Sequence, residues 1–346
     1  MTPLALDCRL LSPSHPTFII AEIGVNHDGS LCRALELVAD AKSAGADAVK
    51  LQIFRAASLM HPSASFASYQ EAHCPALTPI DMLHRYELPA DAIHTVVAAI
   101  RSAGLMPLAT PFSPSDIDTL GALDLAAIKI ASPDLINYPL ILRACSLHKP
   151  LLISTGAATL GEVAATVDYL RTLAAPFALL HCISSYPTPP TDANLCWIRE
   201  LAVFGVPVGF SDHTTDDLTG AIAVGGGACI IEKHLTYDRS AQGPDHSASA
   251  DPPQFTRYTR AIRLADQLKG SPGKRPLPCE QDIRQVSRQS LVTTRPLPAN
   301  HLLSESDLTT QRPATGIPPS QINHVLSKRT TRPLPAATLL QWHMLT

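Results

Sequence analysis

Val206-Pro207-Val208-Gly209-Phe210-Ser211-Asp212-His213 and Ala228-Cys229-Ile230-Ile231-Glu232-Lys233-His234 are two apolar runs, each followed by a histidine. Unbroken apolar runs are typical of parallel strands that helices cover on the outside. If the two strands are neighbours in a parallel barrel, both imidazoles lie at one mouth. There they would hold a divalent metal ion and leave its other positions to water or substrate. Two ordinary core or capping histidines would give the same pattern, so the rest of the chain must decide.

Strand-like and helix-like segments alternate along the first 270 residues. Amphipathic stretches over 31–44, 91–103 and 161–173 separate some of the apolar runs. About eight such units predict a (β/α)8 TIM barrel. The alternative is a doubly wound open sheet, but the glycine fingerprint of a dinucleotide site is missing. The predicted strands are 18–23, 48–53, 105–109, 126–130, 151–154, 178–182, 206–210 and 228–232.

The composition changes near residue 270, where a Gly/Pro-rich segment, 270–278, interrupts the alternation. Beyond it, Thr-Thr-Arg-Pro-Leu-Pro-Ala occurs twice, at 293–299 and at 330–336. Short strands punctuated by prolines are typical of a compact β module with blunted edges. We therefore expect a barrel domain over 1–270, a linker over 271–284 and a small β domain over 285–346.

Bulk composition narrows the function. Of the 346 residues 45% are hydrophobic and the net charge is −3, without a run of Lys or Arg. We therefore expect a small-molecule partner rather than nucleic acid or a membrane surface. Residues 1–16 lack a signal-peptide pattern and no segment is long enough to span a bilayer, which predicts a cytoplasmic protein. The 8 cysteines are scattered without a C-x-x-C pair, so we expect reduced thiols.

Polar residues occur at nearly every predicted strand end. In a (β/α)8 barrel the carboxyl ends of the strands form the active-site face. Each residue alone could be a hydrogen-bonded core group or a helix cap. Together, such charged groups are costly to desolvate without a charged ligand, and lysines with hydroxyls suit a phosphate and a carboxylate. These residues are Glu22, Lys50, Gln52, Lys129, Ser132, Ser154, Tyr186, Ser211, His213, Glu232 and His234.

Several motifs carry a family resemblance. They are Ile20-Ala21-Glu22-Ile23-Gly24-Val25-Asn26-His27, Lys50-Leu51-Gln52, Ser154-Thr155-Gly156, Tyr186-Pro187-Thr188-Pro189, Phe210-Ser211-Asp212-His213, Ile231-Glu232-Lys233-His234 and Gly243-Pro244-Asp245-His246. In this order they resemble the sialic acid synthase (N-acetylneuraminate synthase) family. Arg312-Pro313-Ala314-Thr315-Gly316-Ile317 resembles that family's C-terminal SAF (antifreeze-like) module. The resemblance implies a TIM barrel followed by a β-clip-type SAF domain.

The same resemblance implies a transferase that forms a C–C bond. It would condense phosphoenolpyruvate with an N-acylaminosugar aldehyde, most typically N-acetylmannosamine, and water, giving a nine-carbon sialic acid and phosphate. The implied metal is Mn²⁺, with Mg²⁺ or Co²⁺ as substitutes. An N,N'-diacetyllegionaminate synthase or a phosphosugar-using synthase is the alternative product class. A sugar-binding scaffold that has lost catalysis is the non-enzymatic alternative, against which the intact histidines, Glu22 and strand lysines argue.

Site roles follow residue by residue from the resemblance. His213 and His234 would bind the metal, and Glu22 would act as general base. Arg312 would come from the SAF domain of a partner subunit, which implies a domain-swapped homodimer. The residues for phosphoenolpyruvate would be Lys50, Lys129, Ser132, Ser154, Tyr186 and Ser211, and those for the sugar Gln52, Glu232, Asp245 and Arg312.

Three departures from the family pattern concern the pocket. Asp134 stands where many relatives have glutamate, which leaves its role open. Ala314 replaces a glycine beside Arg312 and would tilt that loop. The stretch 58–80, expected to shape the sugar pocket, matches only loosely through Tyr69 and Gln70.

Overall fold

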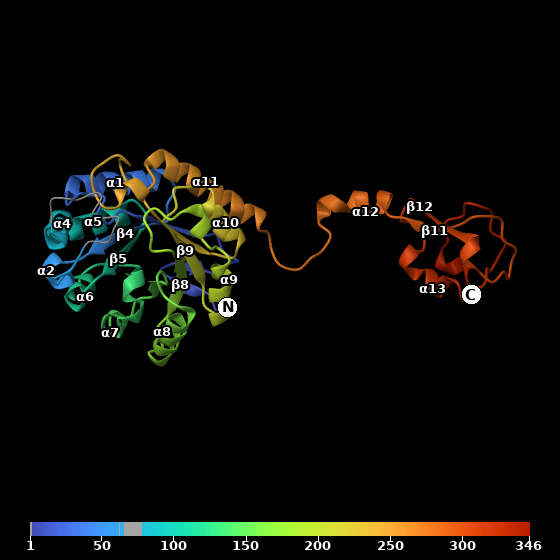
Figure 1. Ribbon diagram of the computed structural model, residues 1–346. Coiled ribbons are helices and arrows are strands. Elements are labelled where there is room, and N and C mark those ends of the chain that lie inside the picture. Colours follow the sequence, from blue (N-terminus) through green and yellow to red (C-terminus); the bar gives the residue numbers. More distant parts are fainter. Residues whose placement is uncertain (1, 62, 66–77) are drawn as a thin grey trace. The chain divides into compact units, whose positions relative to one another are not determined.

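The computed structural model describes residues 2–61, 63–65 and 78–346 (Figure 1). The chain divides into two compact units, Met1–Ser271 and Pro272–Thr346. Each unit has its own hydrophobic core, so the two are described separately.

Eight parallel strands close the first unit into a barrel, which confirms the predicted TIM-barrel fold. Neighbouring strands pair in the order β10-β3-β4-β5-β6-β7-β8-β9. Their carboxyl ends therefore meet at one mouth. The strands are β3 (Phe18–Glu22), β4 (Ala48–Ile53), β5 (Met106–Pro111), β6 (Ala127–Ile130), β7 (Leu151–Ser154), β8 (Phe177–Cys182), β9 (Val208–Asp212) and β10 (Ile230–His234).

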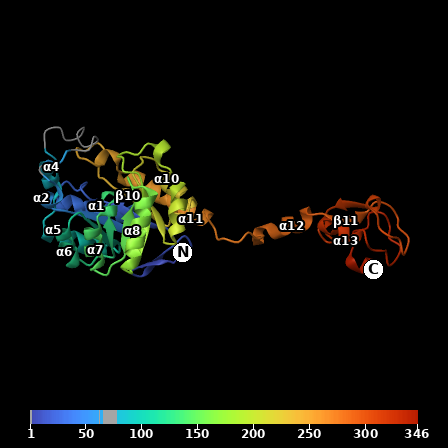
Figure 2. The ribbon, with the colours of Figure 1, turned by 60° about the horizontal axis from the view of Figure 1, so that its bottom comes forward.

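Helices surround the barrel (Figures 1 and 2). Each amphipathic helix turns its apolar face toward the strands, as α1 does with Ala34, Leu37, Val38 and Ala41. An N-terminal hairpin, β1 (Leu4–Leu6) with β2 (Arg9–Leu11), precedes the barrel. The helices are α1 (Leu31–Ser43), α2 (Ala56–Leu59), α4 (Pro79–Tyr86), α5 (Ala90–Ser102), α6 (Pro114–Gly121), α7 (Tyr138–Cys145), α8 (Leu160–Thr172), α9 (Trp197–Leu201), α10 (Thr219–Gly225) and α11 (Pro252–Leu268).

The strands that carry the two histidines lie two residues later than predicted. Pro207 has no N–H to give to a ladder, so β9 begins only at Val208. The Ala228 N–H still bonds to Ala223 of the preceding helix, so β10 begins at Ile230. As a result His213 directly follows β9 and His234 is the last residue of β10. The two strands are paired neighbours, as predicted.

An apolar plug fills the amino-terminal part of the barrel. Phe18, Ile20, Leu108, Leu152 and Leu180 point inward and are fully buried, together with side chains of the β1–β2 hairpin. A second, larger cluster packs the outer faces of the strands against the helices. Because the plug closes one end, the interior is open to polar side chains only at the carboxyl ends of the strands.

The second unit is a small β-rich module. It contains α12 (Gln281–Ser287), β11 (Ser290–Thr293), β12 (Leu308–Gln311) and α13 (Ile322–Val325). The two sequence repeats pair through Leu297 and Leu334. Each repeat also makes the same contact with the other, because Thr293 Oγ1 donates to Pro335 O (2.7 Å) and Thr330 Oγ1 donates to Pro298 O (2.6 Å). The end of the expected linker is helical, since α12 crosses residue 284.

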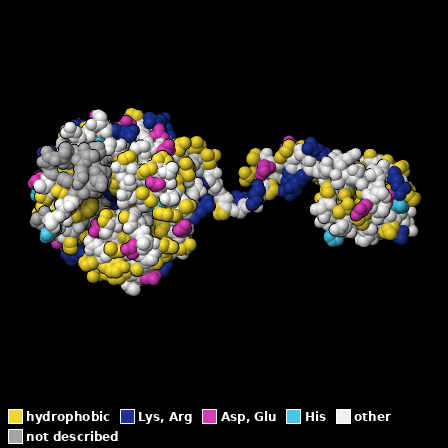
Figure 3. Space-filling model, viewed as in Figure 1, with side chains coloured by type: hydrophobic (Ala, Val, Ile, Leu, Met, Phe, Trp, Pro, Cys, Tyr) yellow, Lys and Arg dark blue, Asp and Glu magenta, His cyan; other side chains and the backbone are white. Residues whose placement is uncertain are grey.

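The surface charges and the cysteines of the described residues give no further indication of function. Lys and Arg are scattered over the visible face of the barrel unit rather than gathered in a stripe (Figure 3). None of the described helices is long and apolar enough to cross a bilayer. The described cysteines are free thiols, and Cys74 lies outside the described residues.

Candidate active site

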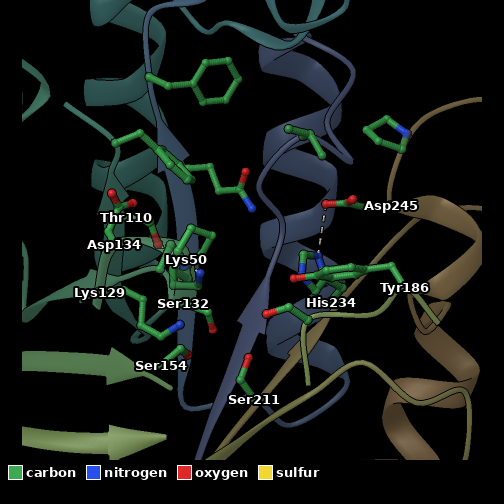
Figure 4. Close-up of a pocket in the computed structure, with 18 of the residues that line it drawn as sticks. Lys50, Thr110, Lys129, Ser132, Asp134, Ser154, Tyr186, Ser211, His234 and Asp245 are labelled. Atoms are coloured by element: carbon green, nitrogen blue, oxygen red, sulfur yellow. Dashed lines mark hydrogen bonds and ion pairs between the residues drawn. The ribbon is translucent and has the colours of Figure 1, made fainter. Parts of the chain in front are cut away.

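A cavity of about 500 Å³ opens at the carboxyl ends of the barrel strands (Figure 4). Strands β4 to β10 or the loops that follow them contribute to its wall. Most of the residues that the sequence pattern singled out meet here, although they are up to two hundred residues apart in the chain. The cavity-lining residues predicted from the sequence are Lys50, Gln52, Lys129, Ser132, Ser154, Tyr186, Ser211, His213, Glu232, His234 and Asp245.

Four buried charged side chains form a chain of ion pairs at the floor, of which Lys50, Lys129 and Glu232 line the cavity while Glu22 lies behind Lys50. Lys50 Nζ contacts Glu22 Oε2 and lies 3.6 Å from Glu232 Oε2. Lys129 Nζ donates to Glu232 Oε1 (3.0 Å), and Ser211 Oγ donates to the same oxygen (2.7 Å). Each of the four charged residues is at most 5% exposed. With two carboxylates and two ammonium groups the network is close to neutral, so it can accept an added anion without a large excess of negative charge.

The pKa shifts show how the network divides its protons. Burial opposes charge on Glu232, but Lys129 and Lys50 outweigh it and hold the pKa of Glu232 far below its ordinary value. Burial also opposes charge on Lys50, yet Glu22 and Glu232 raise its pKa. For Glu22 burial dominates over Lys50, and the pKa of this carboxyl is raised. A carboxyl with a raised pKa beside a permanently charged partner can exchange a proton in a reaction.

Hydroxyl groups lie beside the lysines. Ser154 Oγ is buried and has no hydrogen-bond partner. Ser132 Oγ accepts from the Gly156 N–H (3.0 Å), and a side chain at Gly156 would collide with Ser184 Oγ and Ser132 Oγ. A buried hydroxyl with no partner is costly, so Ser154 is explained by a polar ligand that it can contact.

The two histidines face one another across the mouth. Their ring centroids are 5.6 Å apart, and the Tyr186 ring lies 4.1 Å from that of His213. His213 Nδ1 donates to the backbone oxygen of Ile183 (2.7 Å). Burial opposes charge on this ring, but Cys182 and the Ile183 carbonyl outweigh it and raise the pKa of His213, so a metal that bound at Nε2 would displace a proton. His234 Nδ1 is buried without a hydrogen bond, 3.6 Å from Asp245 Oδ2 (dashed in Figure 4).

These histidines fit a divalent metal ion. Burial and the neighbouring His213 lower the pKa of His234 well below its ordinary value, so its imidazole is neutral and has a free lone pair. A backbone carbonyl that fixes one ring nitrogen, as Ile183 does for His213, is the usual second partner of a metal-binding imidazole. Within the described residues no group of three or more His, Cys, Asp or Glu side chains is arranged to hold a metal. Two protein ligands would leave the other positions to water or substrate.

The outer part of the cavity is apolar. Its wall is made by loops and helices that precede or follow strands β3 to β5, and one T-shaped pair within it joins Phe54 to Phe112 (6.0 Å). The stretch 58–80, expected to shape the sugar pocket, contributes Leu59 and Met60 to this wall. The other residues of the wall were not singled out for the sugar pocket, because apolar residues such as those of α4 look like ordinary core. Among the described residues the wall comprises Val25, Phe54, Leu59, Met60, Met82, Leu83 and Phe112.

Asp245 and Gln52 also line the cavity. Burial, with the nearby charge of Glu22, raises the pKa of Asp245 to about 7. Gln52 is half-buried on β4.

Asp134 also lines the cavity and accepts from Asn137 Nδ2 (2.9 Å), and burial raises the pKa of its carboxyl. Thr110, near the end of β5, accepts a hydrogen bond from Lys50 Nζ (3.0 Å). Its position at a strand end is the feature of the sequence that indicates a place in the site.

Two groups of expected site residues lie elsewhere. Arg312 is exposed in the second unit, followed by a cis peptide bond to Pro313, with Ala314 next in the chain. Arg312 is not among the described residues that line the cavity. Tyr69 and Gln70 lie outside the described residues.

Comparison with known proteins agrees with this geometry. The NeuB family matches residues 37–274 and the SAF domain matches residues 288–346. The chain is 41% identical to the N,N'-diacetyllegionaminic acid synthase of Legionella pneumophila, over 94% of this chain and 93% of that protein. It is 30% identical to the human N-acetylneuraminate-9-phosphate synthase, over 94% and 93%.

A solved structure is also similar. It is the N-acetylneuraminic acid (sialic acid) synthetase of Leptospira borgpetersenii, in complex with citrate, with a TM-score of 0.74 and 30% identity over 82% of this chain and 95% of that one. Family matches and relatives thus cover both units. The chain belongs to the NeuB family of phosphoenolpyruvate-dependent nonulosonic acid synthases and ends in a SAF domain.

Proposed function

We propose that this protein condenses phosphoenolpyruvate with a diacetamido trideoxy hexose to give N,N'-diacetyllegionaminic acid and phosphate. The observation that carries the choice of sugar is the division of the cavity into a charged floor and an apolar outer wall. The 41% identity to a synthase of that product supports the same choice. N-Acetylmannosamine, the acceptor expected from the sequence motifs, is the second candidate because a 30% identical solved structure is an N-acetylneuraminic acid synthetase.

The charged floor suits phosphoenolpyruvate. Lys129 and Lys50 lie on adjacent parts of the cavity, and the partnerless hydroxyl of Ser154 is buried beside them. Cations with hydroxyl and backbone donors are the groups that bind phosphate and carboxylate. The remaining residues proposed for this substrate are Ser132, Tyr186 and Ser211.

The apolar wall suits a sugar without a charge or hydroxyl at its far end. Among the described cavity-lining residues, Lys50 and Lys129 are the Lys and Arg side chains, and both belong to the floor. Residues 56–84 contain no Lys or Arg in the sequence. A sugar 6-phosphate would therefore meet Phe54, Met82 and Leu83 in place of a cation from this chain, whereas a 6-methyl group and a second acetamido methyl would be buried favourably.

The chemistry follows from the placement of the groups. His213 and His234 would hold a divalent ion, which would supply Lewis acidity toward the aldehyde oxygen of the open-chain sugar. The π electrons of the phosphoenolpyruvate double bond form the new C–C bond to the aldehyde carbon, and the aldehyde oxygen becomes a hydroxyl by taking up the proton that the attacking water loses. The positive charge that develops on the phosphate-bearing carbon is met by water, whose proton Glu22 accepts, and phosphate departs as the C–O bond to it breaks. Gln52, Asp245 and Glu232 would orient the sugar.

The SAF domain completes this proposal. Because Arg312 lies in the second unit, we assign it to the acyl group of a sugar bound by a partner subunit, in a domain-swapped homodimer. Mn²⁺ is the proposed metal.

A phosphate-release assay tests the function. Purified protein is given phosphoenolpyruvate, Mn²⁺ and, in parallel, the diacetamido trideoxy hexose, N-acetylmannosamine or its 6-phosphate, and the products are identified by mass. We expect kcat/KM for the first sugar to exceed that for the other two at least ~10-fold, the range that a small group in an apolar pocket gives. A higher value for N-acetylmannosamine would reassign the acceptor. Sugar binding without turnover of any acceptor would instead indicate a scaffold protein.

A further inference from the structure

Three buried side chains form a polar network directly behind the two histidines. Lys233 Nζ donates to Asp212 Oδ2 (3.0 Å), and the Tyr258 hydroxyl donates to the same oxygen (2.7 Å). Lys233 Nζ also lies 4.7 Å from the centre of the Tyr258 ring. All three residues are at most 1% exposed, and none of them lines the cavity. We call Asp212, Lys233 and Tyr258 the strand clamp.

The register of the barrel explains where the clamp lies. Lys233 and Asp212 are opposite one another on the paired strands β10 and β9. Successive side chains of a strand point to opposite faces, so Glu232 and Ser211 point into the barrel while the clamp residues point outward under α11. Each of the two strand residues immediately precedes a histidine. The clamp therefore ties together the two backbone segments that carry His213 and His234.

The clamp also holds the backbone that follows His213. Asp212 Oδ1 accepts from the Thr214 N–H (2.8 Å), and Lys233 Nζ donates to Thr214 O (2.7 Å). One residue later, Gln254 Nε2 donates to Thr215 O (2.8 Å). His213 thus lies between two anchored residues, although it comes after the end of its strand, where a loop would otherwise be free to move.

Energetics argue that the clamp does more than stabilise the fold. Removing an ammonium and a carboxylate from water costs about as much as their attraction returns, and apolar replacements of such pairs are often neutral or stabilising. Here the pair does not line the cavity, so it is not a substrate contact. It fixes the positions of the two backbone segments that carry His213 and His234.

We propose that the strand clamp positions the imidazoles of His213 and His234 at the separation that a divalent metal requires. The clamp residues are positioning residues that act through the histidines. The inference rests on the metal-binding role proposed above for that pair. It predicts that metal affinity depends on the clamp far more than phosphoenolpyruvate affinity does. Of the residues proposed for phosphoenolpyruvate, Ser211 shares β9 with Asp212, whereas Lys50, Lys129 and Ser154 lie on other strands.

The test uses the double variant Asp212→Asn/Lys233→Met, which removes both charges together and leaves neither buried alone. Mn²⁺ binding to the metal-free full-length protein is measured by electron paramagnetic resonance, phosphoenolpyruvate binding by calorimetry and the fold by thermal melting. We expect Kd for Mn²⁺ to rise at least ~10-fold, as for other second partners of metal ligands. Phosphoenolpyruvate affinity should stay within about twofold, and Tm within a few degrees. The milder Tyr258→Phe change should give a smaller rise in the same Kd.

A partly exposed ion-pair cluster at the other end of the barrel serves as a control. Arg263 Nη2 pairs with Asp47 Oδ2 (2.7 Å), and Asp47 also pairs with Arg9 Nη1 (2.6 Å) and accepts from the Ile19 N–H. Asp47→Asn/Arg263→Met should lower Tm and leave Kd for Mn²⁺ unchanged. An unchanged Kd in the clamp variant would overturn the proposal, as would equal losses of Mn²⁺ and phosphoenolpyruvate affinity in step with Tm. Should the wild-type protein bind Mn²⁺ no better than its His234→Ala variant, the metal site itself would be wrong, and the clamp proposal would fall with it.

Discussion

At the scale of single residues, the site contains buried polar groups that lack a hydrogen-bond partner or whose charge is opposed by burial. Ser154 Oγ and His234 Nδ1 have no hydrogen-bond partner, and Glu22 has a raised pKa in a fully buried position. Each of these states costs free energy in the absence of ligand. The cost is explained if substrate and metal supply the missing partners when they bind at the mouth of the barrel.

His234→Ala removes one proposed metal ligand and is expected to abolish metal-dependent turnover, with a loss greater than 100-fold. The fold should persist, because the backbone bonds of β10, such as Ala250 N to His234 O (2.9 Å), do not involve the ring. Activity is measured across a Mn²⁺ titration, and the exposed His94→Ala serves as control. A His234→Ala protein that kept its full rate in chelating buffer would refute the ligand assignment.

His27 is expected to make stability depend on pH. Burial lowers the pKa of His27 to about 4, and its Nδ1 accepts from the Gly29 N–H (3.1 Å). Below pH ~6.5 the unfolded chain takes up a proton that the folded state refuses, so the free energy of unfolding falls until the pH reaches about 4. The loss from this group amounts to about 2–3 kcal/mol.

His27→Asn keeps an acceptor for Gly29 but cannot titrate. Denaturation curves of both proteins between pH 7.5 and 4.5 give the difference in unfolding free energy, in which the contributions of all other groups cancel. That difference should shift in favour of the variant as the pH falls. A difference independent of pH would show that His27 has the same pKa in the folded and unfolded states.

At the scale of elements, the approach of α10 to α11 supports the mouth. The two helices pack closely, and a Cβ at Gly220 would lie 2.4 Å from the Tyr258 hydroxyl oxygen and 2.5 Å from Cζ of its ring. A rigid ring that is fully buried has no room to retreat. The small residue in α10 therefore lets the tyrosine reach Asp212 on β9.

Gly220→Ala is expected to destabilise the barrel by about 1–3 kcal/mol through overpacking. Gly225→Ala on the same helix is the matched control, since a Cβ there meets nothing within 4 Å and should be neutral or slightly stabilising. Thermal melting of the two variants gives the comparison. Equal stabilities would show that the two helices separate easily and that Tyr258 is not held by them.

At the scale of the whole molecule, the chain consists of two units with separate cores, and the expected sugar-binding arginine is not in the unit that contains the cavity. In the proposed domain-swapped dimer, a second copy would contribute its small domain and Arg312 to the site. Sugar binding would then depend on assembly.

Arg312→Ala is expected to raise KM for the sugar at least ~10-fold and to leave KM for phosphoenolpyruvate nearly unchanged, because a charge-assisted hydrogen bond to one substrate is lost. Steady-state kinetics with each substrate varied in turn measure both values. Equal effects on the two would count against a contact with the acyl group.

Co-expression of Arg312→Ala with Lys129→Met tests whether the arginine acts across subunits. A swapped heterodimer contains one site with both residues intact, so activity should return to a substantial fraction of wild type. The comparison is made with the sugar held below its wild-type KM, where Arg312→Ala is slow. The alternative, an arginine that acts within its own chain, predicts that the mixture is no more active than the average of its two parents.

The amino-acid sequence by itself determined that this protein has helix-covered parallel strands, because eight apolar runs separated by amphipathic stretches have that periodicity. The absence of a dinucleotide glycine fingerprint favoured a barrel over an open sheet, and the pairing of β10 with β3 closes it. It also determined which polar residues lie together, since strand alternation places Ser211 and Glu232 inside the barrel. The predicted bounds of β9 and β10 were two residues too early, because Pro207 and the end of α10 delay the start of these strands.

Tertiary structure alone decided what closes the site. The apolar wall comes from Phe54, Met82 and their neighbours on elements whose pattern is that of ordinary core, and the strand clamp comes from residues 46 positions apart at their widest. Contacts between distant segments depend on how helices pack on the barrel, and no local periodicity encodes them.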